Sequence, residues 1–333
     1  MDISKLKDLF NDFNSSNIII IGDVMIDAYI WGDVNRISPE APVPVLSGNL
    51  RENRLGGAAN VALNIKALGA NPILCSIIGK DQKSEIFTGL LDKLNLTNEG
   101  ILCREDRRTT VKTRLISNNQ HLLRVDEEDT GIINNDIEKE FIHNIKEIIS
   151  SKKIDAIVFE DYDKGVITEN IIKEITAIAN ENKIVTTVDP KKRNFKYYKN
   201  ITLFKPNFKE FTEGIGKSFV KSDIDTMFKE SVKFISENKI DNMFVTLSEN
   251  GVFICSEGDY HVQPTEIRDI VDVSGAGDTV ISISTLCLSK NISKKDIAIM
   301  SNIAGGLVCE KVGVVPINKD QLLLECMKFY GSK

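Results

Sequence analysis

Short apolar runs alternate along the chain with longer segments in which apolar residues recur at helical spacing. Continuous apolar runs of this length are typical of strands in a parallel sheet that is covered on both faces. The expected strands are residues 17–23, 73–79, 154–159, 184–188, 201–204 and 243–247, and the expected helices are 58–69, 84–94, 136–150, 169–181 and 223–238. This alternation predicts an α/β fold in which a parallel sheet lies between layers of helices.

Two segments lack intervening helices and alternate in the manner of β-strands, residues 31–50 and 109–124. We expect them to form a small sheet that projects from the main one, with bounds of about 31–54 and 105–125. Such a sheet is a plausible lid, because closing over reactants excludes water. The chain has no repeat, low-complexity tract or Pro/Gly/Ser-rich linker, so we expect residues 1–333 to form a single domain.

The overall charge excludes some classes of partner. The net charge is −6 and the pI is near 5.4, so a broad basic face for nucleic acid is not expected, although a small basic pocket is compatible with these values. Six scattered cysteines and only three histidines argue against structural zinc and a disulfide framework. The N-terminus lacks the apolar core of a signal peptide, and no apolar run approaches the roughly 20 residues that span a bilayer. We therefore expect a cytoplasmic protein with no membrane partner.

The stretch VDVSGAGDT, residues 271–279, is the strongest candidate for chemistry. A strand is expected over Ile267, Ile270, Val271 and Val273, followed by a turn and a helix. The turn residues Gly275, Ala276 and Gly277 let a ligand approach the backbone, and the first N–H groups of a helix bind anions well.

Asp278 is unexpected beside such an anion site. A carboxylate next to a phosphate costs electrostatic energy unless it takes a proton from an attacking hydroxyl group. The alternative interpretation is an ordinary acidic residue in the first turn of a helix.

Further candidates follow the expected strands, where ligands of open α/β sheets collect. Each has a structural alternative as a turn, capping or helix-packing residue. Asp23 and Asp27 are expected to bind sugar hydroxyls, with Gly56, Gly57 and Asn60 nearby; Asp161 and Lys164 are expected at the substrate, and Asp189 and Lys191 at the phosphates.

Asn207 and Glu210, three residues apart, could hold Mg²⁺ through water. A plain capping arrangement explains the same spacing. On the lid, Lys112, Arg114 and Arg124 could grip a substrate phosphate, whereas the alternative is an exposed sheet edge that carries cations to deter pairing.

Taken in order, these motifs resemble the ribokinase-like (PfkB) family of carbohydrate kinases over about residues 15–328. The resemblance rests on the glycine pattern around 56–79, on Asn207 and Glu210, and on Asp272 with 275–278. Within the family, the chain most resembles the D-glycero-β-D-manno-heptose 7-phosphate kinases of ADP-heptose biosynthesis. The segments responsible are 21–32, 36–45, 55–71, 161–165, 188–191 and 274–280.

The resemblance implies a three-layer αβα fold with a β-sheet lid, and roles for individual residues. Asp278 would be the catalytic base and the backbone of 275–277 the anion hole. Asn207 and Glu210 would organise Mg²⁺ and phosphates, and Ser248, Gly251 and Asn302 would lie around the nucleotide. The implied cofactors are ATP and Mg²⁺, with a monovalent cation left open, and the implied partner is a second copy of the chain bound through the lid.

The chain departs from the family pattern at Glu160, where a small residue is usual, at Lys205 in place of threonine, and at Lys192-Arg193 in place of a glycine. These departures lie near the expected substrate and phosphate sites, so they leave the sugar open more than the reaction. The chain ends at Lys333, so the resemblance further implies a kinase without a nucleotidyltransferase domain.

The expected reaction is therefore ATP-dependent phosphorylation of the anomeric O1 of heptose 7-phosphate to the 1,7-bisphosphate. Two alternatives remain open. One is another kinase of this fold, acting on a fructose phosphate, ribose or a nucleoside. The other is a non-catalytic sugar or nucleotide sensor, although a sensor has no need of a base such as Asp278.

Overall fold

The computed structural model describes residues 1–118, 120–266 and 268–331, which contain a nine-stranded main sheet and a separate four-stranded sheet. The main sheet has the strand order β13-β12-β11-β10-β9-β8-β1-β4-β5. Its strands are β1 (Asn17–Gly22), β4 (Asn71–Gly79), β5 (Gly100–Arg104), β8 (Ala156–Glu160), β9 (Val185–Asp189), β10 (Leu203–Phe204), β11 (Asn242–Thr246), β12 (Val252–Cys255) and β13 (Tyr260–Gln263). The pairs from β11 to β5 are parallel, and β12 and β13 are antiparallel additions at one edge.

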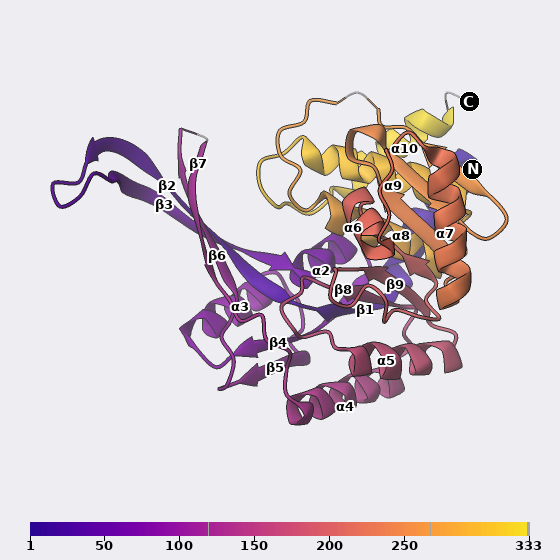
Figure 1. Cartoon of the computed structure of the whole chain (residues 1–333), viewed down its shortest axis with the longest axis horizontal. Helices are drawn as coiled ribbons and strands as arrows, with labels where there is room; N and C mark the ends of the chain where they lie inside the picture. Colours follow the sequence, from indigo (N-terminus) through magenta and orange to yellow (C-terminus); the bar gives the residue numbers. More distant parts are fainter. Residues whose placement is uncertain (119, 267, 332–333) are drawn as a thin grey trace.

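Helices cover both faces of the main sheet (Figure 1). The helices are α1 (Ile3–Asp12), α2 (Ala58–Ala67), α3 (Gln82–Lys93), α4 (Asn135–Ser151), α5 (Glu169–Glu181), α6 (Phe208–Ile215), α7 (Ile224–Asn238), α8 (Ala276–Ser289), α9 (Lys294–Cys309) and α10 (Lys319–Gly331), with short 3-10 turns at Phe13–Ser15 and Ser248–Asn250. Helices α4 and α5 pack on one face with α7, whereas α2, α8 and α9 pack on the other. The predicted layered α/β fold is thus confirmed.

Strand β1 shows why its sequence produces this layering. Successive side chains of a strand point to opposite faces. Ile18 and Ile20 join the hydrophobic core under α2 and α8, and Ile19 and Ile21 join the core under α4 and α5. All four side chains are fully buried, so a continuous apolar run is required where a sheet has no solvent-facing side.

The order in which successive strands are added to the main sheet reverses beside β1. From β1 the chain moves outward through β4 to β5, and later returns to β8 on the other side of β1 before continuing through β9 to β11. Ligands of open α/β sheets bind beyond the carboxyl ends of strands at such a switch point. The fold therefore directs attention to the residues that follow β1, β8 and β9.

The second sheet projects from the main body (Figure 1), as the sequence predicted. Its strands are β2 (Val24–Ile37), β3 (Pro44–Gly57), β6 (Val111–Ser117) and β7 (Gln120–Glu127), in the order β3-β2-β6-β7. The first strand pair begins earlier than expected, because β2 follows β1 after the single residue Asp23. We call this element the projecting sheet. No helix in the described part of the chain is long and apolar enough to cross a membrane.

The strand expected before the glycine turn is not present over residues 268–274, and Ile267 lies outside the described residues. The side chains of Ile270, Val271 and Val273 are more than half exposed, so they do not form a buried strand. The N–H groups of Val271 and Asp272 both donate to the carbonyl oxygen of Cys309 at the end of α9. Hydrophobic spacing in this segment therefore indicated the wrong structure.

Candidate active site

The glycine turn begins helix α8, as predicted from the sequence. Gly275 is the residue before the helix and has φ +79°, a conformation that favours glycine. A Cβ on Gly275 would also lie 2.9 Å from Nδ2 of Asn60. Ala276 and Gly277 form the first turn, where backbone N–H groups have no partner within the helix. This arrangement suits an anion.

Asp278 is buried in the same first turn and is held by two side chains from other elements. Nδ2 of Asn60 on α2 donates to Oδ2 at 2.6 Å, and the hydroxyl of Tyr162 donates to Oδ1 at 2.9 Å. Burial raises the pKa of Asp278, and these two hydrogen bonds oppose that shift. A buried carboxylate with a raised pKa is well suited to accept a proton.

Charged residues gather at the ends of β8, β9 and β10. Nζ of Lys205 lies 2.7 Å from Oδ2 of Asp189, and both atoms lie within 4 Å of the point that a Cβ on Gly277 would occupy. Nζ of Lys191 contacts Oε1 of Glu210 at 2.5 Å and Oδ1 of Asp189 at 3.5 Å. These residues and Glu160 form a charge cluster, in which the ammonium group of Lys205 lies beside the anion-binding turn.

Glu160 is the member of the charge cluster without a matching partner. Its side chain is buried, and its Oε2 has no hydrogen-bond partner within the described part of the chain. Burial, and then the charges of Asp189 and Asp278, raise its pKa well above the ordinary value. Burial also acts against the charge of Lys205, but the nearby carboxylates of Asp189 and Glu160 raise the pKa of this lysine.

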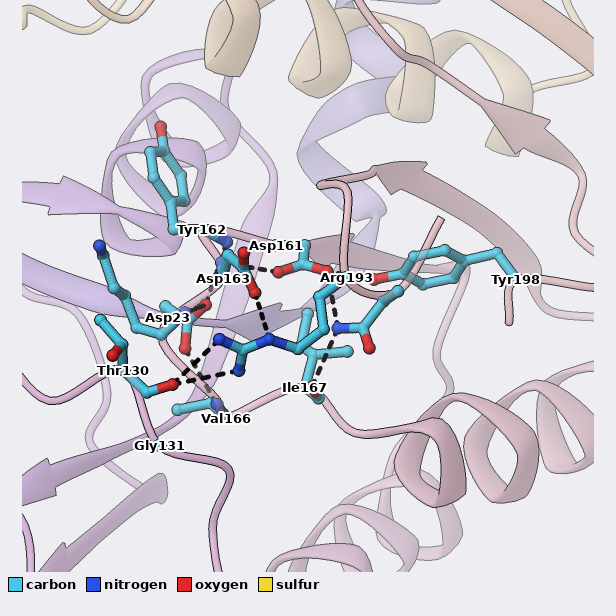
Figure 2. Close-up of polar contacts among 12 residues, drawn as sticks. Asp23, Thr130, Gly131, Asp161, Tyr162, Asp163, Val166, Ile167, Arg193 and Tyr198 are labelled. Atoms are coloured by element: carbon cyan, nitrogen blue, oxygen red, sulfur yellow. Dashed lines mark hydrogen bonds and ion pairs between the residues drawn. The ribbon is translucent and has the colours of Figure 1, made fainter. Parts of the chain in front are cut away.

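Asp23 holds a loop together. Its carboxylate accepts hydrogen bonds from the backbone N–H groups of Tyr162, Lys164 and Val166 at 3.0–3.1 Å (Figure 2). The expectation that Asp23 binds sugar hydroxyls therefore needs revision, because three donors from the protein already occupy its oxygens. Its position after β1 instead orders the segment that follows β8.

Asp161 has a similar structural environment. It accepts hydrogen bonds from Nδ2 of Asn194 at 2.9 Å and from the hydroxyl of Tyr198 at 3.1 Å (Figure 2). Burial, and then the charge of Asp23, raise its pKa to about 6. We infer that Asp161 orders the loop 161–165 from below rather than facing a ligand.

Two predicted substrate residues contact each other at the base of the projecting sheet. Nη1 of Arg114 lies 2.5 Å from Oδ1 of Asp27, and both side chains are largely buried. Gly56 leaves room for this carboxylate, since a Cβ there would lie 2.1 Å from Oδ2 of Asp27. Gly57, with φ +62°, turns the chain from β3 into α2, which carries Asn60.

The remaining predicted cations differ in their environment. Arg124 forms an ion pair with Asp126 on the exposed strand β7 at 2.8 Å. Lys164 pairs with Glu128 at 2.6 Å. Burial, and then the charge of Lys164, lower the pKa of Lys112. Of the three, Lys112 is the one whose positive charge the surroundings oppose.

Asn207 and Glu210 form a reciprocal capping box at the start of α6. The side chain of Asn207 accepts from the N–H of Glu210 at 2.9 Å, and Oε2 of Glu210 accepts from the N–H of Asn207 at 2.8 Å. The structural alternative for this motif is thus realised. The described residues contain no cluster of three or more His, Cys, Asp or Glu side chains that could hold a metal. These oxygens fit a hydrated Mg²⁺ better than a fully protein-bound one.

Ser248, Gly251 and Asn302 lie around one backbone segment, 263–265. The carbonyl oxygen of Ser248 accepts from the hydroxyl of Thr265 at 3.3 Å, and Nδ2 of Asn302 on α9 donates to the carbonyl oxygen of Pro264 at 2.9 Å. A Cβ on Gly251 would lie 2.0 Å from the carbonyl oxygen of Gln263. The three residues are therefore brought together, although their expected nucleotide contacts stay a prediction.

The sequence does not single out Tyr162, which contacts Asp278, or Arg193, which contacts the loop that carries Tyr162. Tyr162 lies in the DYDKG motif, but the motif was interpreted for its acids and lysine. Arg193 was noted only as a departure from a glycine. Glu160 and Lys205 are departures from the family pattern, and only the fold shows that both lie near Asp189.

Comparisons with known proteins identify the family of the chain. A model of the pfkB family of carbohydrate kinases matches residues 15–321. The chain belongs to this family. As a member, the kinase is a phosphotransferase that acts on a sugar. The kinase is 35% identical over 308 residues to the bifunctional protein HldE of Helicobacter pylori strain G27, and the match covers 92% of this chain and 65% of the relative.

A second HldE, from Methylobacillus flagellatus, is 36% identical over 306 residues, with 92% of this chain and 62% of the relative covered. The kinase thus spans less than two thirds of the length of these curated relatives. Among solved structures, phosphofructokinase-2 from Escherichia coli in complex with potassium has a TM-score of 0.77 at 17% identity, covering 95% of this chain and 99% of that one. Arabidopsis thaliana ribokinase complexed with ribose and ATP has a TM-score of 0.70 at 15% identity, with the same coverage. Both confirm the ribokinase-like fold.

Proposed function

We propose that the kinase phosphorylates the anomeric O1 of D-glycero-β-D-manno-heptose 7-phosphate with ATP, giving the 1,7-bisphosphate in ADP-heptose biosynthesis. The resemblance to heptose 7-phosphate kinases and the identity to HldE proteins support this substrate. The observation that carries the proposed reaction is Asp278, buried beside the glycine turn and oriented by Asn60 and Tyr162. A carboxylate in this position has a chemical use only if a hydroxyl group loses its proton there.

In the proposed mechanism, Asp278 accepts the proton of O1 as this oxygen attacks the terminal phosphorus of ATP. An anomeric hydroxyl is more acidic than an ordinary alcohol, because the ring oxygen withdraws electrons, so a carboxylate is an adequate base. The N–H groups of the turn 275–277 stabilise the charge of the transferred group. The ammonium group of Lys205, held by Asp189 beside Gly277, adds a fixed positive charge.

Mg²⁺ would bind near Asn207 and Glu210 through water, and it would supply neutralisation of the phosphate charge. Lys191 connects the start of α6 to the charge cluster, because its ammonium group contacts both Glu210 and Asp189. Burial acts against the charge of Lys191, but the carboxylates of Asp189 and Glu210 raise its pKa, so its ammonium group can hold these carboxylates and a phosphate at the same time.

The second phosphate of the substrate is proposed to lie against Lys112 at the base of the projecting sheet. Burial and the neighbouring charge of Lys164 destabilise the ammonium group of Lys112, so a bound phosphate dianion would relieve this cost. Arg114 is less available, because it is paired with Asp27.

Replacing Lys112 by Ala is expected to raise KM for a phosphorylated sugar at least about tenfold, because a charge-assisted hydrogen bond is worth about 1.5–3 kcal/mol. The matched control is Lys80→Ala, since Lys80 is paired with Glu105 on the exposed surface. Steady-state kinetics with purified protein measure both. An unchanged KM in the Lys112 variant would remove this residue from the proposed phosphate site.

The substrate itself is tested by a panel of sugars with the purified kinase. Highest kcat/KM for heptose 7-phosphate supports the proposal, whereas preference for a fructose phosphate, ribose or a nucleoside identifies another sugar kinase of the same fold. Binding of a ligand without turnover on any of these sugars would favour a sensor.

We further propose that residues 1–333 form one kinase domain and that two copies associate through the projecting sheet. Exposed apolar side chains on this sheet support an interface, namely Ile37, Leu50, Leu122, Leu123 and Val125. Light scattering of the purified chain measures the association, and replacing Leu123 by Lys is expected to weaken it.

A further inference from the structure

The proposed base is held in place by a tyrosine from an irregular loop. Tyr162 donates to one oxygen of Asp278, while Asn60 donates to the other from the regular helix α2. The loop 161–165 that carries Tyr162 has neither helix nor strand structure, and Asp163 within it has φ +60°. Its conformation must therefore be imposed by contacts with other segments.

Asp23 supplies one of these contacts from beneath, through the three backbone N–H groups described above. Arg193 supplies another from the side (Figure 2). Nε of Arg193 lies 2.8 Å from Oδ1 of Asp163. Both terminal nitrogens of Arg193 donate to the carbonyl oxygen of Thr130 at 3.1 Å.

Arg193 therefore joins three segments that are far apart in sequence. These are its own loop after β9, the loop 161–165 after β8, and the segment around Thr130 before α4. Figure 2 shows the ring of Tyr162 pointing away from Asp23 and Arg193, so the loop is fixed on one side and presents the phenol on the other. The pattern that the chain otherwise resembles has a glycine in place of Lys192-Arg193, and a glycine offers none of these contacts.

We propose that Arg193 is a positioning residue for catalysis. It acts through Asp163 and the loop 161–165, keeping the hydroxyl of Tyr162 on Asp278 so that the base stays oriented. This inference rests on the proposed role of Asp278 as the base.

The consequence concerns the acidity of the base. The hydrogen bond from Tyr162 favours the ionised form of Asp278 and so lowers its pKa, against the effect of burial. The other charged groups that act on Asp278 are Asp189, which raises the pKa, and Lys205, which lowers it, while Glu160 and Asp278 repel each other. None of these groups lies in the loop that Arg193 holds.

The test is the pH dependence of kcat, with saturating ATP and the best sugar phosphate of the panel. The acid limb reports ionisation of the base in the substrate complex. Tyr162→Phe removes the donor, so the pKa of Asp278 should rise and the limb should move to higher pH by about 0.5–1 unit, since one unit corresponds to 1.36 kcal/mol. Arg193→Ala should shift the limb in the same direction, and the double variant should shift no further than Tyr162→Phe alone.

The matched control is Arg104→Ala. Arg104 pairs with Glu140 at 2.8 Å, and its side chain is 32% exposed, close to the 33% of Arg193. The control should leave the limb unmoved. Arg193→Lys keeps a positive charge near Asp163 but lacks the two terminal nitrogens that donate to the carbonyl oxygen of Thr130. Its acid limb should therefore lie between those of the wild type and of Arg193→Ala.

Three outcomes would overturn the inference. Arg193→Ala could lower Tm and leave the acid limb at its wild-type position, which indicates a purely structural residue. Additive shifts in the double variant would show that Arg193 and Tyr162 act independently. An unmoved limb in Tyr162→Phe would show that the phenol does not tune the base. Near-normal turnover of Asp278→Asn would instead refute the proposed base, so the two failures are distinguishable.

Discussion

Replacing Asp278 by Asn is expected to lower kcat by about 10² or more while leaving sugar binding largely intact, because general-base catalysis typically contributes about 10²–10⁴. The amide has nearly the shape of the carboxylate but cannot accept the proton of O1. Turnover is measured with saturating ATP and sugar phosphate, and sugar affinity by calorimetry without ATP.

Asp296→Asn is a closely matched control. Asp296 occupies the same helix position in α9 that Asp278 occupies in α8, three residues after the capping residue, and it also accepts a hydrogen bond from a tyrosine, Tyr330, at 2.6 Å. This variant should change stability and not kcat. If Asp278→Asn kept near-normal turnover, the acid would be an ordinary first-turn residue and another group would have to take the proton.

Lys205→Met is expected to lower the free energy of unfolding by about 3–5 kcal/mol, which is typical when one partner of a buried ion pair is removed. The side chain of Lys205 is 2% exposed. The buried Glu160 would lose this cation, and Asp189 would keep Lys191, at 3.5 Å. Urea denaturation measures the loss. Lys233→Met serves as the control, because Lys233 is 62% exposed and should change stability by less than about 0.5 kcal/mol.

The pH dependence of Lys205→Met has a definite sign. The pKa of Glu160 is already raised well above its ordinary value by burial and by the charges of Asp189 and Asp278. Loss of the Lys205 cation raises this pKa further, so the folded state binds more protons than the unfolded state between the two pKa values. Stability then falls as pH rises through the folded-state pKa. The destabilisation should therefore be larger at pH 8 than at pH 5.5, and adding Glu160→Gln should recover part of it. A loss below about 1 kcal/mol at pH 8 would contradict the proposed charge balance.

The layered fold could be predicted because the buried apolar residues recur along the sequence at the spacing of strands and helices. The apolar run of β1 has no polar face, and only a sheet covered on both sides requires such a run. The same reasoning failed for residues 270–273, where apolar spacing is present but the side chains are exposed. No strand or helix is predicted from the sequence at the late elements β12, β13, α9 and α10.

The candidate site was harder to predict, because a motif gives residue types and not the direction of their hydrogen bonds. Asp23 follows a strand, as expected of a ligand-binding acid, yet three backbone N–H groups occupy it. Asn207 and Glu210 have the predicted spacing, which a capping box explains equally well.

Contacts between distant segments left no local signal at all. Arg193 and Thr130 are 63 residues apart, and Tyr162 and Asp278 are 116 apart. Only the fold brings such partners together. Their chemistry was visible in the sequence, but their pairing was not.

The projecting sheet is joined to the main sheet by a very short connection. Only Asp23 separates β1 in the main sheet from β2 in the projecting one, and the same residue clamps the backbone of Tyr162, Lys164 and Val166. A movement of the projecting sheet relative to the main sheet is therefore expected to displace Asp23, whose carboxylate holds the loop 161–165. If binding of a sugar phosphate immobilises the projecting sheet, amide hydrogen exchange at those three positions should slow, because all three amides donate to Asp23.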